Sequence, residues 1–341
     1  MCPDCRAHVR ALLAARAGAQ RQIGQRHSTV QVALIGFISV AVIAGLLNHY
    51  AAAIASPSPS PRGAWQVVDD IHFNSPVGLA EDQAHNLFVA DAAAHHVYKL
   101  SPRGEVLGTF GTHGSAPGQF DRPTGVALDA AGNVYVADTA NSRIQKLSPS
   151  GAYQAAWGSP GVAPGQFNAP RGVAVDHEGY VYVADTGNDR LEKLSPLGKL
   201  VAVWGHSGAG PGELRQPFGV ALDAEDSVYV ADTGNHRIQK LSAAGTLVGV
   251  WGSFGTAPGQ FNSPRWLTVD SRGEVYVSDT YNHRIQLLSS SGVVEGEYGA
   301  RGGQPGQFRR PEALAVDEAG VLAVVDADND RVQRYVPSPG I

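Results

Sequence analysis

Cysteine is nearly absent from this chain: the 341 residues include two, Cys2 and Cys5, both at the extreme N-terminus. Everything beyond them lacks a disulfide partner, so the bulk of the chain must be stable through packing alone. Its length is sufficient for a hydrophobic core that needs no covalent cross-link. The two cysteines have the spacing of half a zinc knuckle, but a structural zinc site needs four ligands, and we expect no metal there.

Recognisable motifs of catalysis are also lacking. No glycine-rich phosphate loop follows a strand and opens a helix, and no nucleophile elbow or isolated pair of carboxylates is present. The sequence therefore assigns no catalytic residue, no metal ligand and no cofactor.

Basic residues are scarce outside the N-terminus. Five of the 26 Lys and Arg residues and one of the 31 Asp and Glu residues precede Ala51, which leaves 21 basic and 30 acidic residues and a formal net charge of −9. A surface with this balance repels phosphate backbones. Nucleic acid is therefore not an expected partner.

Long apolar runs are missing with one exception, Val30 to Leu47, which contains 18 residues without a charge. As a helix this run would be ~27 Å long, close to the hydrocarbon thickness of a bilayer. Five arginines precede it, and the next basic residue is Arg62, an asymmetry that predicts a cytoplasmic N-terminus.

We predict a basic cytoplasmic tail over 1–28, a single transmembrane helix over 29–50 and a Ser/Pro-rich linker over 51–63. The protein would then be a single-pass protein of the cell membrane with its C-terminal part outside the cytoplasm. Ala53-Ile54-Ala55 is also an acceptable signal-peptidase pattern, and cleavage near Ala55 would instead secrete the protein.

What the sequence has in abundance is repetition. An aspartate recurs every 47 residues without an insertion or deletion, a regularity typical of repeat architectures. The series is Asp91, Asp138, Asp185, Asp232, Asp279 and Asp326.

Each repeat predicts four strands. Val134 to Asp138 is a β-branched and aromatic run that reads as a second strand, preceded by an alternating inner strand from Pro123 to Asp129. Arg143 to Leu147 alternates again and predicts a third strand, and an aromatic residue ends the fourth. That aromatic series is Phe110, Trp157, Trp204, Trp251 and Tyr298.

The last repeat lacks its fourth strand, because the chain ends five residues after Val336. An unmatched outer strand around Trp65 precedes the first inner strand. Pairing the two would close the ring and remove an exposed edge. Six inner strands then predict six blades over 64–337, followed by a short tail over 338–341.

The repeated unit Pro-Gly-Gln-Phe…Val-Tyr-Val-Ala-Asp-Thr-Gly-Asn-x-Arg-Ile-Gln-Lys resembles the NHL repeat, from about Trp65 to Val336. The resemblance implies an all-β, six-bladed β-propeller, here preceded by a transmembrane helix. It implies little about function, because NHL propellers include RNA-binding and ubiquitin-ligase-linked proteins, a peptide-amidating lyase and extracellular sensor domains of bacterial kinases. The layout is similar to that of the sensors, although the cytoplasmic tail is too short to be a kinase.

Comparison of the blades separates scaffold from site. Asp138, Asn141 and Arg143 recur in the later blades, which indicates a structural role in turns and charge pairs. In contrast, the residue after the inner-strand proline varies. It is Val77, Thr124, Arg171, Phe218, Arg265 or Glu312.

We predict a ligand-binding channel mouth made by Arg171, Phe218, Arg265, Trp266 and Glu312, since mixed charge and aromatic character is common in ligand sites. The alternative is a set of solvated rim residues. Trp266 replaces the glycine or alanine of the other blades and either fills the gap between blades or forms a pocket wall.

Histidines share one repeat position in three blades, at His95, His236 and His283. The repeat places no further ligand beside them, so we expect no metal there. The amidating lyase of the NHL family uses histidine-bound zinc in its central cavity, and the six inner-strand entries of this chain contain no histidine.

The favoured function is an extracytoplasmic binding or interaction scaffold for a peptide, glycan, protein or small molecule. The alternative is a propeller enzyme, a lyase or hydrolase with a metal-dependent or metal-free site at the channel mouth, for which perturbed carboxylates in a cleft would be the discriminating observation. RNA binding and ubiquitin transfer are less favoured, given the negative charge and the two cysteines, too few for a RING domain.

Overall fold

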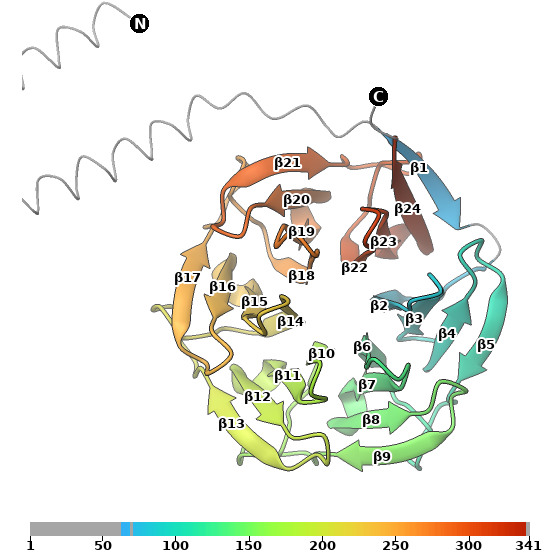
Figure 1. Cartoon of the computed structure of the whole chain (residues 1–341), viewed down its shortest axis with the longest axis vertical. Coiled ribbons are helices and arrows are strands. Elements are labelled where there is room, and N and C mark those ends of the chain that lie inside the picture. The colour runs from blue at the N-terminus through green and yellow to red at the C-terminus, as the bar shows by residue number, and fades with distance from the viewer. Residues whose placement is uncertain (1–62, 69–70, 339–341) are drawn as a thin grey trace, which may run out of the picture. The chain divides into compact units, whose positions relative to one another are not determined.

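The computed structural model describes residues 63–68 and 71–338. These residues form six four-stranded antiparallel sheets arranged around a central axis (Figure 1). The prediction of an all-β, six-bladed propeller is confirmed.

Each blade runs outward from the axis, and its strands follow the chain order in blades one to five. Blade one contains β2 (Pro76–Glu81), β3 (Leu87–Asp91), β4 (His96–Leu100) and β5 (Val106–Phe110). Blade two contains β6 (Pro123–Leu128), β7 (Val134–Asp138), β8 (Arg143–Leu147) and β9 (Tyr153–Trp157). Blade three contains β10 (Val173–Val175), β11 (Val181–Asp185), β12 (Arg190–Leu194) and β13 (Leu200–Trp204).

The remaining blades repeat this pattern. Blade four contains β14 (Pro217–Leu222), β15 (Val228–Asp232), β16 (Arg237–Leu241) and β17 (Leu247–Trp251). Blade five contains β18 (Pro264–Val269), β19 (Val275–Asp279), β20 (Arg284–Leu288) and β21 (Val294–Tyr298). Blade six contains β22 (Pro311–Val316), β23 (Leu322–Asp326), β24 (Arg331–Pro337) and the N-terminal β1 (Gly63–Val68).

Five short 3₁₀ helices follow the second strands of blades two to six. They are η1 (Thr139–Asn141), η2 (Thr186–Asn188), η3 (Thr233–Asn235), η4 (Thr280–Asn282) and η5 (Ala327–Asn329).

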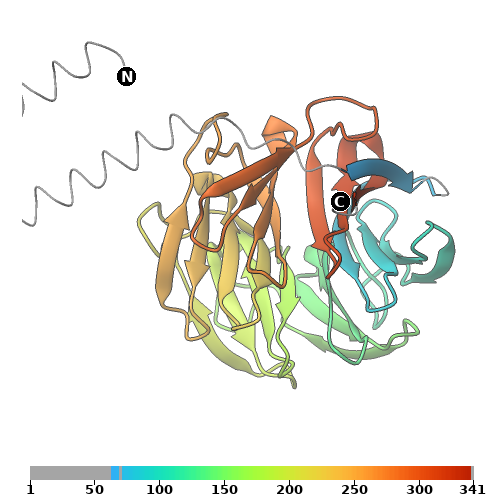
Figure 2. The ribbon, with the colours of Figure 1, turned by 45° about the horizontal axis from the view of Figure 1, so that its top comes forward.

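The ring is closed by its two ends, as the missing fourth strand predicted. β1, the blue strand in Figure 2, pairs antiparallel with β24 near the C-terminus. In this register Trp65 lies opposite Tyr335. The Trp65 ring lies 5.1 Å from that of Phe308 and 5.3 Å from that of Tyr335. Closure gives both strands a partner and buries aromatic surface at the junction. β1 begins at Gly63, the last residue of the predicted linker.

The second strands are buried along their whole length, because they lie in the middle of a sheet that is covered on both faces by neighbouring blades. The inner strands approach one another closely as well. A Cβ atom added to Gly125 would overlap the carbonyl oxygen of Arg171 in the next blade. Glycine at this position is therefore a packing requirement.

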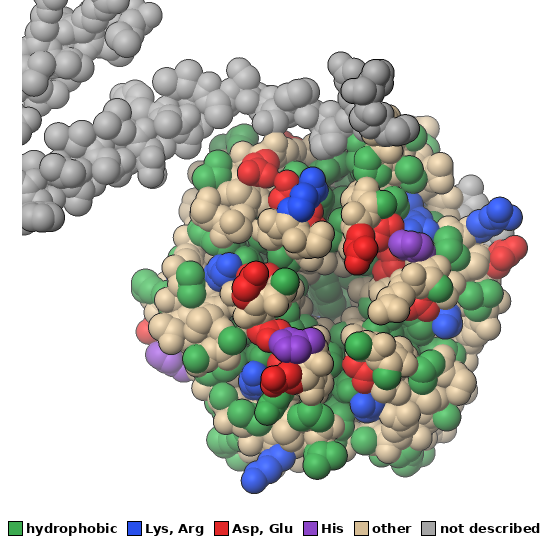
Figure 3. All heavy atoms as spheres, in the orientation of Figure 1, with side chains coloured by type: hydrophobic (Ala, Val, Ile, Leu, Met, Phe, Trp, Pro, Cys, Tyr) green, Lys and Arg blue, Asp and Glu red, His purple; other side chains and the backbone are tan. Residues whose placement is uncertain are grey.

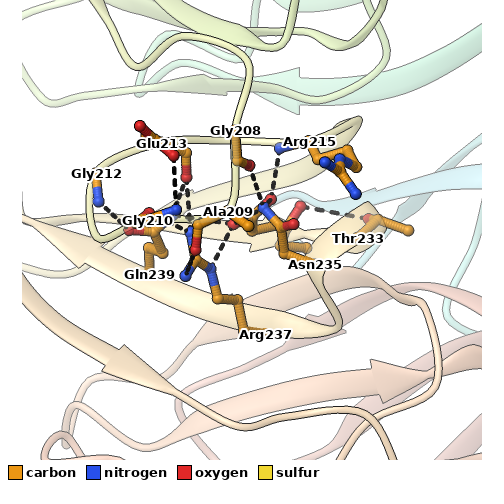
Figure 4. A network of polar contacts seen from close by, with 12 residues as sticks. Gly208, Ala209, Gly210, Gly212, Glu213, Arg215, Thr233, Asn235, Arg237 and Gln239 are labelled. Atoms are coloured by element: carbon orange, nitrogen blue, oxygen red, sulfur yellow. Dashed lines mark hydrogen bonds and ion pairs between the residues drawn. The ribbon is translucent and has the colours of Figure 1, made fainter.

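A recurrent polar network joins the second strand of each of blades two to six to the loop before its inner strand, and Figure 4 shows it in blade four. The buried Asp232 carboxylate accepts from the backbone N–H of Arg215 at 2.8 Å, from Arg237 Nε at 2.6 Å and from Gln239 Nε2 at 3.0 Å. Asn235 Nδ2 also donates to this carboxylate, at 2.9 Å.

The remaining donors of Arg237 bind the backbone of the preceding loop. Its Nη1 donates to the carbonyl oxygen of Ala209 at 2.8 Å, and its Nη2 donates to those of Gly210 and Glu213 at 2.7 and 2.8 Å. The same aspartate–arginine contact recurs in blades two, three, five and six. The scaffold interpretation of the Asp-x-x-Asn-x-Arg motif is confirmed.

No helix among residues 63–68 and 71–338 is long and apolar enough to cross a membrane. The predicted cytoplasmic tail, the transmembrane helix and the linker up to residue 62 lie outside the described residues. They stay predictions.

Candidate functional site at the channel mouth

The starts of the six inner strands surround a cavity of about 670 Å³ at one end of the central channel. Each blade contributes to its lining the residue that follows the inner-strand proline. These residues are Val77, Thr124, Arg171, Phe218, Arg265 and Glu312. The structure thus places four of the five predicted site residues around one cavity, whose volume is that of a small-molecule pocket.

Glu312 is the one carboxylate in this lining, and its side chain is 1% exposed. Arg265 Nη1 donates to its Oε1 atom at 2.6 Å, across 47 residues of sequence, and Arg310 Nε lies 3.3 Å from the same oxygen. Burial raises the pKa of Glu312, and the charges of Arg265 and Arg310 oppose that rise. Its second oxygen, Oε2, is buried and has no hydrogen-bond partner among the described residues.

Phe218 is an aromatic platform for two guanidinium groups. The Arg171 guanidinium carbon lies 4.8 Å from the centre of the Phe218 ring, and that of Arg265 lies 5.2 Å from it. Arg265 is also fixed by its Nη2 atom, which donates to the Tyr281 hydroxyl at 3.2 Å. The ring thus holds both cations in defined positions beside the cavity.

Trp266 does not line the cavity. It is 5% exposed and packs edge-to-face against Phe218, with the ring centres 5.3 Å apart. Both rings belong to a buried apolar cluster that includes Leu79 and Ala313 of blades one and six. This geometry is that of a packing residue behind the lining, the first of the two interpretations considered for Trp266.

Two arginines of the cavity were not predicted. Arg122 and Arg310 stand one residue before the inner-strand proline and have left-handed backbone φ values of 51° and 53°. Comparing the blades one position earlier would have found them, because that position also varies between Ser75, Ala169 and Gln216.

The histidines of the repeat have a structural contact. His95, His236 and His283 each place Nδ1 next to the backbone N–H of a residue in the following blade, at 3.1, 2.9 and 3.1 Å. Asp189 does the same with a carboxylate oxygen, at 2.7 Å from the N–H of Gln216. These side chains therefore cap the segment that leads into the neighbouring inner strand.

Two groups of three side chains have ligand atoms within 4.8 Å of one another, the spacing of a metal site. The groups are His95, His113 and Asp121, and Glu81, His85 and Asp317. His95 Nδ1 already accepts the N–H of Arg122, and Glu81 is paired with Arg334 Nη2 at 3.0 Å. Each group has a contact within the fold that accounts for one of its members, and we assign a metal to neither.

The opposite ends of the inner strands have aspartates in place of the arginines of the mouth. The inner strands end there in turns whose aspartates accept backbone N–H groups, as Asp176 and Asp223 do. Asp226 and Asp270 lie in the same depression. In Figure 3, which shows one face of the ring, Asp and Glu side chains gather around the central hollow. Asp176, Asp223 and Asp270 are paired with Lys193, Lys240 and Arg272, at 3.7, 3.1 and 2.9 Å, so these carboxylates have partners within the fold.

The family model described as NHL repeat matches residues 120–147, 214–241 and 261–286, in blades two, four and five. The chain is a six-bladed β-propeller of NHL-type repeats. No curated protein matches its sequence.

Solved structures resemble this NHL propeller in fold. A streptogramin B lyase has 14% identity and a TM-score of 0.59, over 80% of this chain and 97% of that one. The virginiamycin B lyase of Staphylococcus aureus has 13% identity and a TM-score of 0.58, over 81% of this chain and 100% of that one. A gluconolactonase of Xanthomonas campestris has 14% identity and a TM-score of 0.60, over 84% and 99%. At these identities the likeness concerns the fold alone.

Proposed function

We propose that this NHL propeller is a binding protein whose channel mouth recognises a peptide, glycan, protein or small molecule. The observation that carries the proposal is the cavity of about 670 Å³, lined by the residues at which the blades differ. Around it the Asp-x-x-Asn-x-Arg network repeats in five blades. A rigid ring with a variable mouth presents fixed side chains to a ligand at little cost in conformational entropy.

The test is a screen of the purified full-length protein for thermal stabilisation by peptides, sugars, organic acids and metal ions. A ligand that binds the native state alone raises its stability, by about 2.7 kcal/mol at 100 times its Kd. We expect at least one compound to raise the melting temperature, and we expect Arg265→Ala to reduce that rise. If stabilising ligands bind every mouth variant as they bind the wild type, the opposite face of the propeller becomes the candidate site.

The proposal includes a location: a single N-terminal helix over 29–50 tethers the chain, and the propeller lies outside the cytoplasm. Its support is the uncharged run from Val30 to Leu47 and the excess of arginine before it. Protease added to intact cells should then remove the propeller. A propeller that resists digestion in intact cells and is degraded after lysis would have the opposite orientation.

A second candidate function is a propeller enzyme, a lyase or hydrolase. One observation favours it: Glu312 is a carboxyl group in the cavity whose pKa burial raises, a property of general acids. The similar folds of the streptogramin B lyase and the gluconolactonase add only that such rings host both chemistries. Turnover of a cyclic ester or lactone that Glu312→Gln abolishes, with binding retained, would establish catalysis in place of simple recognition.

A further inference from the structure

Arg171 is a cation without a counter-ion. Among residues 63–68 and 71–338, its guanidinium contacts the Phe218 ring at 4.8 Å but makes no hydrogen bond or ion pair. Burial lowers the pKa of Arg171, the nearby charge of Arg265 lowers it further, and the charge of Glu312 raises it. Arginine stays charged at neutral pH. The fold thus holds a half-buried positive charge that is in direct contact with no anionic group in the described part of the chain.

The other charged residues of the mouth form no ion pair with Arg171. The lining contains four arginines, at positions 122, 171, 265 and 310, against the single carboxylate of Glu312. That carboxylate is already in contact with Arg265 at 2.6 Å and with Arg310 at 3.3 Å. Arg310 also reaches Asp328, at 3.3 Å. The cavity therefore has an excess of positive charge, and Arg171 is the buried part of that excess.

Glu312 does not offer a hydrogen-bond acceptor to a ligand. Its Oε2 atom is buried and has no partner among the described residues, but it has no exposed surface toward the cavity. The group of the mouth that is open to an anion is therefore Arg171.

We infer that the channel mouth binds a small organic anion, with its carboxylate or phosphate on Arg171. Guanidinium groups bind either anion through two parallel hydrogen bonds, and Phe218 holds Arg171 in place before the ligand arrives. The inference rests on the proposed binding function and specifies the chemistry of the ligand.

The test uses isothermal titration of the full-length protein with glucuronate, glucose 6-phosphate and glucose. The first two share the hydroxyl groups of the third and add a carboxylate or a phosphate. We expect at least one of the charged sugars to bind about tenfold or more tightly than glucose, since a charge-assisted pair is worth at least that ratio. Which of the two binds more tightly distinguishes a carboxylate ligand from a phosphate ligand.

Variants assign the binding to Arg171. Arg171→Ala should weaken binding of the preferred sugar about tenfold or more, and Arg171→Lys should restore part of it, because a point charge replaces the bidentate fork. Arg103→Ala is the matched control, because Arg103 is exposed in the turn between β4 and β5. It should change the affinity by less than about twofold.

Two results would overturn the inference: equal affinity for glucose and both charged sugars, including no binding of any, or unchanged binding by Arg171→Ala. If the broader screen then finds a neutral ligand whose binding depends on Arg265, the proposed function survives and only the anion inference falls. If the screen finds no ligand dependent on the mouth, both fall.

Discussion

The Asp-x-x-Asn-x-Arg network and the channel mouth use arginine in contrasting ways. In blade four, Arg237 is matched by the buried Asp232 and by three backbone carbonyl groups of the preceding loop. At the mouth, Arg171 has an aromatic ring beside it and no anionic partner among the described residues. The arginine that recurs in blades two to six is satisfied by the fold, whereas Arg171 has hydrogen-bond donors left for a ligand.

The largest expected effect concerns the network. Asp232→Ala leaves Arg237 buried without its carboxylate, and breaking a buried ion pair in this way costs about 3 to 5 kcal/mol of unfolding free energy. Chemical denaturation measures the loss. Glu225→Ala, an exposed acidic residue in the same blade, is the control and should change stability by less than about 0.5 kcal/mol. Equal stability of the two variants would mean that the network is not a scaffold.

Trp266 packs behind the lining of the mouth, and its substitution tests whether it belongs to the scaffold or to the binding site. Trp266→Ala should cost about 3 kcal/mol, the low end for loss of a buried indole, because the packing it supports borders a cavity. Trp266→Phe should cost less, since an aromatic ring still contacts Phe218. Thermal denaturation of both variants would show the difference, and a stable Trp266→Ala protein with impaired ligand binding would make the indole a pocket wall.

The network of blade three can be tested through its pH dependence, because Glu192 replaces the glutamine found at this position in the other blades with the network. Glu192 accepts the N–H of Gly165 at 3.0 Å, where Gln239 in blade four accepts that of Gly212 at 2.9 Å. Burial raises the pKa of Glu192 to about 7, from an ordinary value of 4.5. The folded state therefore holds a proton between these two pH values that the unfolded state has lost. Stability is fully present below pH 4.5 and falls as pH rises through 7.

Glu192→Gln should remove that dependence. The unfolding free energy of the variant minus that of the wild type should then be about 1 to 2 kcal/mol larger at pH 8 than at pH 5, after allowance for solvent screening. The reciprocal change, Gln239→Glu, should introduce the same dependence into blade four. Denaturant titrations at the two pH values measure both. A Glu192→Gln protein whose stability still falls toward pH 8 as the wild type's does would place the titrating group elsewhere.

The smallest expected effect belongs to the mouth. Arg171→Ala removes no hydrogen bond or ion pair that the structure describes and should change the unfolding free energy by less than about 0.5 kcal/mol. Arg190→Ala in the same blade should cost several times more, because Arg190 binds Asp185 at 2.9 Å. If thermal denaturation shows that the two variants lose similar amounts of stability, the arginines of the network and of the mouth do not differ in structural role.

Much of the fold was predictable because the repeat has no insertions. The position of each second strand follows from the aspartate series, and the closure of blade six by Trp65 follows from a strand missing at one end and an extra one at the other. These inferences need only local alternation and the rule that sheet edges are paired.

The site was predictable in part. Variation between blades located Arg171, Phe218, Arg265 and Glu312 around one cavity, but it also suggested Trp266, which lies behind the lining. It missed Arg122 and Arg310, whose left-handed backbone turns the chain at the cavity edge. Whether a variable side chain points into the channel depends on backbone geometry that residue type does not specify.

The sequence by itself determined the period of 47 residues, the four strands of each blade, the number of blades and the strand that closes the ring. Each of these follows from the repeat period, from the alternation within a strand and from the rule that sheet edges are paired. Only the tertiary structure decided which charges at the mouth neutralise one another. Arg265 and Glu312 meet at 2.6 Å across 47 residues, while Arg171, at the same position in its own blade, is left with an aromatic ring. Such pairing is set by distances between neighbouring blades at the mouth, and those distances exist only once the blades have packed into the ring.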